Sequence, residues 1–143
     1  MSDSLDVEEQ QNIALARRFF DAIEHGDLAE IAGIYHPRAV IWHNDARLQS
    51  TREQNLGLLE AFVARSATRS YVDRRCMATP AGFVHQHVLI ATRPDGRRLE
   101  LPACVVCAVE DGQILRLDEY YDPSPLPAWL ADDGAAATDQ GTG

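Results

Sequence analysis

The feature that most constrains this chain is a hairpin pattern over residues 99–122, which read LELPACVVCAVEDGQILRLDEYYD. Two runs rich in β-forming residues flank Asp111-Gly112, a dipeptide that favours a two-residue hairpin turn. The second run alternates, so that Leu117 and Glu119 fall on the same face of the predicted strand. A carboxylate on an apolar, buried face is costly unless it is paired or used. We therefore take Glu119 as the first candidate functional residue.

Three helices and several strands are predicted before this hairpin. Asp6 and Glu9 have the spacing of a capping box, and the residues after them carry an apolar stripe at helical period. Capping residues at Asp27 and Thr51 begin a short second helix and a third helix. Besides the two strands of the hairpin, strands are predicted over residues 39–44, 70–77 and 83–92. This order is typical of an α+β domain with a strongly curved antiparallel sheet.

The strand over residues 83–92 carries two histidines on one face. His85 and His87 share that face with Phe83, and both faces of the strand are largely apolar. We therefore expect both imidazoles to lie at least partly inside the protein.

The strand over residues 39–44 has an ambiguous orientation. Trp42 and Asn44 share one of its faces, while Ile41 and His43 share the other. We place Trp42 and Asn44 on the interior side, but the sequence leaves open whether His43 takes the place of Asn44 there.

Composition and charge limit the classes of function. The chain has 143 residues, enough for one domain, and its net charge of −9 disfavours nucleic acid and anionic membranes as partners. It has no apolar run long enough to span a bilayer, and the acidic N-terminus lacks the pattern of a secretion signal, which predicts a cytoplasmic protein. Cys104 and Cys107 lie three apart in a predicted strand and are interpreted as small core residues. We expect a flexible N-terminus, one domain and a disordered C-terminal tail, over residues 1–6, 7–127 and 128–143.

Two segments resemble a known family. The stretch EHGDLAEIAGIYHPRAVIWHN, which begins at Glu24, and the closing pattern V-x-DG-x-I-x-x-x-x-EYYD are similar to those of the NTF2-like superfamily, specifically its SnoaL-like branch. The resemblance covers residues 7–122 and implies an NTF2-like cone, in which three N-terminal helices pack on a curved antiparallel (mixed) β-sheet and enclose a pocket. It also implies a small apolar molecule as ligand, no cofactor, and a homodimer formed through the outer surface of the sheet.

The related ketosteroid isomerases match this chain poorly at their catalytic positions. They carry a tyrosine on the first helix, where this chain has Phe19 or Phe20, and a general-base aspartate at or beside the position of His43. Their second aspartate falls near Cys104 or Val105, again without a match. The resemblance therefore does not imply steroid isomerisation.

The related limonene epoxide hydrolases match in part. They have Tyr-x-Asn on the first strand, Arg-x-Asp on a middle strand and a closing aspartate. The matching positions hold Trp42 and Asn44, then His85 and His87, then Glu119. The amide and the closing acid are kept, whereas two histidines replace the Arg-Asp pair, which implies a polar site with different chemistry.

Our hypothesis is a proton shuttle of the cyclase or isomerase type, acting on an apolar compound that bears a carbonyl or hydroxyl. His87 acts as general base or acid, His85 is its partner, and Glu119 orients the pair, because a neighbouring carboxylate raises the basicity of a histidine. The residues expected to bind the substrate are Trp42, Asn44, Phe83, Tyr121 and Phe20.

Three alternatives stay open at this point. Both histidines could be hydrogen-bonded core residues, in which case the protein is a non-catalytic small-ligand-binding module. An epoxide-hydrolase-like enzyme is the second alternative. As the third, His85, His87 and Glu119 form a two-histidine, one-carboxylate set that could bind a metal, although the families that the chain resembles mostly work without one.

Overall fold

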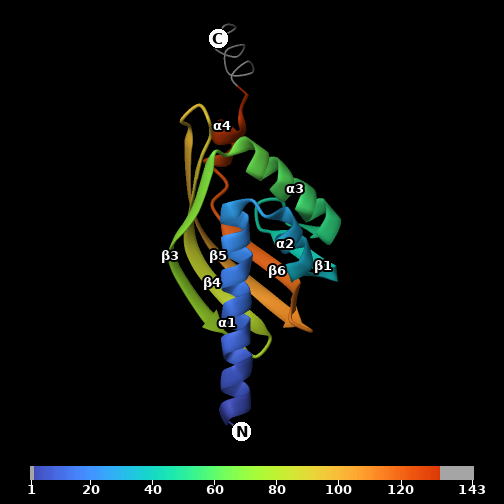
Figure 1. The fold of residues 1–143 in the computed structure, drawn as a ribbon. Coiled ribbons are helices and arrows are strands. Elements are labelled where there is room, and N and C mark those ends of the chain that lie inside the picture. The colour runs from blue at the N-terminus through green and yellow to red at the C-terminus, as the bar shows by residue number, and fades with distance from the viewer. Residues whose placement is uncertain (1, 133–143) are drawn as a thin grey trace, which may run out of the picture.

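The computed structural model describes residues 2–132, with side chains from residue 7 onward. Its elements in chain order are α1 (Ser2–His25), α2 (Leu28–Ile34), β1 (Tyr35–His43), β2 (Leu48–Thr51), α3 (Arg52–Arg65), β3 (Thr68–Ala78), β4 (Gly82–Thr92), β5 (Arg98–Glu110), β6 (Gln113–Tyr121) and α4 (Leu126–Leu130). The six strands form one sheet in the order β2-β1-β6-β5-β4-β3, in which β1 and β6 run parallel and the other neighbours run antiparallel. The sheet curves, α1 crosses its inner face, and α2 and α3 lie to one side of α1 (Figure 1). The predicted α+β cone with a mixed sheet is confirmed.

The predicted hairpin forms β5 and β6. Asp111 and Gly112 occupy its turn, with φ of 55° and 73°. Two successive positive φ angles match the twist of the flanking strands, and Asp-Gly adopts them at low cost. The hairpin thus places Glu119 on β6 directly opposite Val105 on β5.

The core lies between the inner face of the sheet and the helices. Its larger cluster combines α1, α2 and four strands, and its most buried members include Phe19, Phe20, Ile31, Tyr35, Ile41, Phe83, Val105 and Ile114. The apolar stripe of α1 supplies two of these aromatic rings, as its helical period predicts. Cys107 lies in the same cluster, whereas Cys104 faces the outer side opposite Tyr120, so the two cysteines point away from each other.

A second cluster closes one end of the cone and corrects the predicted start of the tail. Trp129 of α4 is 2% exposed and packs with apolar residues of β4 and β5. Its indole Nε1–H donates to the carbonyl of Arg97 at 3.1 Å, and Arg93 Nη1 donates to the Trp129 carbonyl at 2.7 Å. The ordered domain therefore continues past residue 127, the predicted boundary. The rest of the predicted tail, residues 133–143, lies outside the described residues.

Other element boundaries also differ from the predictions. The first helix begins at Ser2, ahead of the capping box predicted at Asp6, and the flexibility of residues 1–6 stays a prediction. The strand β1 starts at Tyr35, four residues before the strand predicted over residues 39–44, so it includes His36-Pro37. The short strand β2 was not predicted. Within the described residues, no helix is long and apolar enough to cross a membrane.

Candidate functional site

One row of side chains crosses the inner face of the sheet. His85 on β4 lies opposite Val105 on β5, Val105 lies opposite Glu119 on β6, and Glu119 lies beside His43 on β1. Directly opposed residues point to the same side of a sheet. Neighbouring strands are about 4.8 Å apart, so the backbone of Glu119 is about 5 Å from that of His43 and about 10 Å from that of His85. The carboxylate therefore pairs with His43, and Val105 separates it from the predicted partner His85.

The His43–Glu119 pair is a short, half-buried carboxylate–imidazole contact. His43 Nε2 lies 3.0 Å from Glu119 Oε1, and the two side chains are 24% and 22% exposed. Burial lowers the pKa of His43, but the hydrogen bond to Glu119 and the charges of Glu119 and Asp45 outweigh it and raise the pKa above its usual value. Among the described residues, none hydrogen-bonds to His43 Nδ1, which leaves this atom available to a ligand.

The orientation predicted for β1 was wrong. Ile41 is fully buried on the inner face, and His43 follows it there, whereas Trp42 lies on the outer face against Tyr120, with ring centroids 5.2 Å apart. The parallel pairing with β6 sets this orientation, because Trp42 lies beside Asp118 on the outer side. Trp42 therefore does not line the interior, and the alternative in which His43 does so is the observed one.

The side chain of Asn44 hydrogen-bonds to the backbone of β6. Its Nδ2 donates to the carbonyl of Tyr121 at 3.0 Å, and its Oδ1 accepts from the Tyr121 N–H at 3.1 Å. The amide thus extends the β1–β6 pairing by one residue, and it is not free to hold a substrate oxygen as predicted. The ring of Tyr121 meets His43 edge-on at 6.2 Å. Burial, together with a hydrogen bond to Asp45, raises the pKa of the Tyr121 hydroxyl.

His85 and His87 form a buried pair of their own. Their Nδ1 atoms are 2.9 Å apart, and the side chains belong to residues that are 2% and 4% exposed. Phe20 stacks on His85 with a centroid distance of 4.1 Å, and Tyr71 meets His87 edge-on at 4.7 Å. Phe83, by contrast, is completely buried in the larger core cluster, so its predicted contact with a substrate is not supported by its position.

The environment keeps both buried histidines neutral. Burial lowers the pKa of His85 to about 4, with a further contribution from the positive charge of Arg74. Burial also lowers the pKa of His87 to about 3, and the charges of His85 and Arg74 act in the same direction. A base with such a low pKa is a poor proton acceptor near neutral pH. The predicted role of His87 as general base is therefore less suited to this site than a role as a neutral hydrogen-bonding group.

The short contact between the two Nδ1 atoms fixes complementary tautomers. Only one of the two nitrogens can carry the shared proton, so one ring is the donor and the other the acceptor. The donor ring then has a bare Nε2, and the acceptor ring has an Nε2–H. The pair thus always presents one hydrogen-bond donor and one acceptor at its two remaining nitrogens.

The three predicted catalytic residues do not form a metal site. Within residues 7–132, three potential ligand atoms come within 4.8 Å of one another only at His36, Glu110 and Asp111. There, His36 Nδ1 accepts the Arg38 backbone N–H at 3.1 Å, so the neutral ring carries its proton on Nε2, which faces Glu110 at 3.5 Å. Arg38 also approaches Glu110 at 3.6 Å. A cation at this place would have to displace both contacts, so the group is better described as a salt-bridge network.

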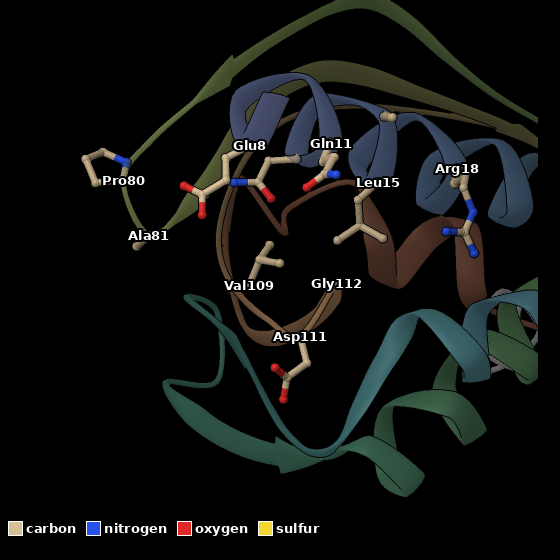
Figure 2. A pocket seen from close by; sticks show the side chains of 11 residues that line it. Glu8, Gln11, Leu15, Arg18, Pro80, Ala81, Val109, Asp111 and Gly112 are labelled. Carbon is tan, nitrogen blue, oxygen red and sulfur yellow. The ribbon is translucent and has the colours of Figure 1, made fainter. Parts of the chain in front are cut away.

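A groove of about 640 Å³ lies apart from all predicted site residues. It runs between the first half of α1 and the β3–β4 and β5–β6 turns (Figure 2). Leu15 and Arg18 face it from α1, while Ala81 and Val109 face it from the other side. Arg18 is already paired with Glu30 at 2.8 Å, and we assign no function to this groove.

The fold and the inner-face side chains define a class, the small α+β cones that carry polar groups on the concave side of one curved sheet. The SnoaL-like domain family matches residues 16–117, and the chain belongs to this family. Among curated proteins, none matches this sequence.

Solved structures support the same assignment. A candidate polyketide cyclase from Xanthomonas campestris pv. campestris superposes with a TM-score of 0.74 at 18% identity, over 87% of this chain and 99% of that one. An LEH-like epoxide hydrolase from M. tuberculosis gives 0.70 at 18% identity, over 86% and 91%. IdmH, a candidate polyketide cyclase from Streptomyces antibioticus, gives 0.72 at 20% identity, over 84% and 98%. At such low identities these structures show the fold alone, and the family match over residues 16–117 confirms the resemblance to SnoaL-like proteins.

Proposed function

We propose that this protein is an acid/base enzyme of the cyclase or isomerase type, which works without a cofactor on an apolar compound that bears a carbonyl or hydroxyl. The observation that carries this proposal is the 3.0 Å contact between His43 and Glu119 on the inner face of the sheet. A histidine with a raised pKa, held by a carboxylate and partly open to solvent, suits proton transfer near neutral pH.

In this mechanism Glu119 orients His43 through one nitrogen and leaves the other for the substrate. Neutral His43 donates Nε2–H to Glu119, so its Nδ1 lone pair can accept a proton from a carbon next to the substrate carbonyl. The resulting imidazolium is stabilised by the carboxylate and can return the proton to a different atom. Glu119 thus keeps its predicted role as the orienting residue, but its histidine is His43.

The buried pair His85–His87 acts in this proposal as a neutral donor. Whichever ring carries Nε2–H can donate a hydrogen bond to a second oxygen at the far end of the substrate and so hold the substrate in place. Phe20, which stacks on His85, offers an apolar surface for the substrate ring. The backbone of His85 lies about 15 Å from that of His43, three strand spacings away, which suits a substrate of two or more fused rings.

Hydrogen exchange tests the proposal without knowledge of the product. Cyclic ketones and polyketide-like compounds are incubated with the protein in D2O, and NMR follows the loss of protons next to the carbonyl. We expect exchange above the buffer rate for at least one compound, and loss of that exchange in His43→Gln. His25→Gln is the matched control, because His25 is exposed and its Nδ1 hydrogen-bonds to the Asp21 carbonyl oxygen on the same helix. Exchange that survives in His43→Gln would overturn the assignment of His43.

A non-catalytic ligand-binding module is the second candidate function. The specific observation in its favour is the buried histidine pair, which offers a donor and an acceptor beside Phe20 without any need for turnover. The same compounds distinguish the two functions. A compound that binds the protein, shifts its NMR signals and yet shows no exchange would support the binding module against the enzyme.

The epoxide-hydrolase-like alternative has less support. Its mechanism uses an Arg-Asp pair where this chain has His85 and His87, and these side chains bond to each other. The carboxylate of Glu119 bonds to His43 rather than to an arginine. Turnover of a limonene-type epoxide that depends on Glu119 but not on His43 would favour this alternative.

We also propose a homodimer formed through the outer face of the sheet. Val106 and Tyr120 are 40% and 48% exposed on this face, beside Trp42. Burying such side chains against a second copy is favourable. Light scattering of the purified protein should give twice the chain mass of 15.8 kDa, and Val106→Glu should shift it toward the monomer. A monomeric wild-type protein would contradict this proposal.

A further inference from the structure

A small opening leads from the surface to the buried histidine pair. It has a volume of about 310 Å³ and lies between α1 and the strands β3 and β4. Its lining residues are Ile13 and Arg17 of α1, Arg74 and Cys76 of β3, and His85 of β4. Cys76 lies directly opposite His85 in the β3–β4 pairing, so both side chains point to the same side of the sheet.

His85 brings an unpaired polar atom to this opening. The residue is 2% exposed, and its Nδ1 is occupied by His87. Its Nε2 makes no hydrogen bond within the described residues. Among these residues, Arg52 Nε is the only fully buried side-chain nitrogen or oxygen without a hydrogen-bond partner, so His85 Nε2 keeps some solvent-accessible surface. The opening that His85 lines is where a ligand could reach this atom. A buried polar nitrogen in this situation is costly unless a ligand or water satisfies it.

The two arginines at the opening differ in their partners. Arg74 is held by Asp21 at 2.8 Å and by Glu24 at 3.0 Å. Arg17 is exposed and makes no hydrogen bond or ion pair with any described residue. Its guanidinium is therefore free to bind an anion.

Two arginines line this opening although the chain as a whole carries −9. Apart from burial, the charge that shifts the pKa of His85 is that of Arg74, and it lowers this pKa. Burial raises the pKa of the Cys76 thiol, while the charge of Arg17 opposes this rise. Asp21 and Glu24 neutralise Arg74, so Arg17 is the cation at this opening that has no carboxylate partner among the described residues.

We propose that this opening is a binding site for the carboxylate of a small apolar acid. One carboxylate oxygen accepts the Nε2–H of His85, the guanidinium of Arg17 pairs with the anion, and Ile13 contacts the apolar part of the ligand. A carboxylate fits better than a phosphate, because the opening offers one free guanidinium and one neutral donor rather than a cluster of cations. The inference goes beyond the proposed function and does not rest on the His43–Glu119 pair, because neither residue lines the opening. It shares His85 with the proposed function, and a carboxylate bound at the Nε2–H of His85 takes up the one donor that the pair offers.

Binding of a carboxylate would also select one tautomer of the histidine pair. His85 must then carry its proton on Nε2, so its Nδ1 accepts the Nδ1–H of His87. The Nε2 of His87 becomes a bare acceptor. The anion thereby sets which nitrogen of the pair donates and which accepts, at a distance from the opening itself.

Nitrogen-15 NMR of the imidazole rings tests the site directly. The probes are benzoate and its neutral analogue benzamide, which have nearly the same shape. Benzoate should move the nitrogen signals of His85 and His87 to a single tautomer, and benzamide should not. Arg17→Gln should weaken benzoate binding about tenfold, the amount expected for one lost charge-assisted contact. Arg18→Gln, the matched loss of charge at a residue that pairs with Glu30, should have little effect.

Alkylation of Cys76 gives an independent readout. The reagents are iodoacetate and iodoacetamide, which differ mainly in charge, and the modified peptides are quantified by mass spectrometry. At Cys76 the ratio of the iodoacetate rate to the iodoacetamide rate should exceed that at Cys104, which lies on the outer face. The excess should disappear in Arg17→Gln and persist in Arg18→Gln.

The outcomes separate cleanly. Equal responses to benzoate and benzamide, or equal effects of Arg17→Gln and Arg18→Gln, would overturn the carboxylate site. Because Arg17 is exposed on α1, the variant should fold, which its backbone amide spectrum would verify. Loss of ketone exchange in His43→Gln tests the proposed enzyme separately, since that variant leaves the opening intact.

Discussion

The inner face of the sheet holds two histidine sites with opposite electrostatics. At the β1–β6 side, His43 is about one quarter exposed and contacts a carboxylate, so its pKa rises. On β4, His85 and His87 are almost fully buried and contact each other, so their pKa values fall to about 4 and about 3. The residue type is the same in both places. The partner and the degree of burial decide whether an imidazole becomes a proton carrier or a neutral hydrogen-bonding group.

The difference between the two sites predicts its largest effect at acid pH, where the buried pair His85–His87 should destabilise the folded protein. In the unfolded chain both histidines bind protons near their usual pKa of about 6.5, whereas in the folded protein they bind them only near 4 and 3. The contribution of the pair to the free energy of unfolding is therefore complete above the pKa of the unfolded chain. It is lost as the pH falls toward the pKa values in the folded protein. Each histidine contributes up to about 1.4 kcal/mol per pH unit in this window.

Urea unfolding between neutral pH and about pH 4 measures this effect. We expect the free energy of unfolding to fall by several kcal/mol, and the slope to be shallower in His87→Gln, which removes one of the two groups. His25→Gln, at an exposed position, should retain the wild-type slope. A flat curve in the wild-type protein would mean that the buried pair titrates in the folded state as it does in the unfolded chain.

The next largest effect compares truncation at the two sites. His87→Ala removes a buried ring and leaves His85 Nδ1 without its partner, which should cost about 2 to 4 kcal/mol of unfolding free energy. His43→Ala removes a partly exposed contact and should cost about 1 kcal/mol or less. Urea unfolding of both variants at neutral pH gives the comparison. Equal costs would contradict the distinction between a structural pair on β4 and a reactive pair on β1 and β6.

The sequence predicts one of these sites better than the other. Alternation alone groups His85 and His87 with Phe83, and Glu119 with Leu117, which predicts that these three polar side chains lie at least partly inside. In β1 the β-forming residues occupy both parities, so the local pattern cannot choose between Trp42 and His43. Parallel pairing with β6, nearly eighty residues away, makes that choice. The partner of Glu119 therefore could not be predicted without the tertiary structure.

The C-terminal segment shows the same limit. The proline-rich composition after β6 predicts a tail, and nothing local to Trp129 indicates burial. Its position depends on Arg93 and Arg97, which bond to it from the β4–β5 turn. A start signal that is local is easier to find: the capping residue Thr51 predicts the beginning of the third helix, and α3 begins at Arg52 with a Thr51–Gln54 capping box.

A smaller effect tests the carboxylate of the reactive pair. Glu119→Gln removes the charge but keeps the shape, so burial then dominates and the pKa of His43 should fall below its wild-type value. In the wild-type protein, the stability from this pair is present below the unfolded pKa and is lost as the pH rises through the folded pKa. Glu119→Gln should lower the free energy of unfolding at neutral pH by about 0.5 to 1 kcal/mol. NMR titration of the His43 ring protons measures the pKa. An unchanged value would show that Glu119 does not raise the pKa of His43.

The smallest effect asks whether the two sites are electrostatically separate. Arg74 lowers the pKa values of His85 and His87, and it is not among the groups that shift that of His43. Arg74→Gln should therefore raise the pKa values of the buried pair slightly and leave that of His43 unchanged. NMR titration of all three rings measures this. Arg17→Gln is the control, because it removes the same charge from the same opening and should leave the pair's values nearly unchanged. A changed pKa of His43 in Arg74→Gln would mean that the two sites titrate as one network. The separate roles proposed for the two sites would then be contradicted.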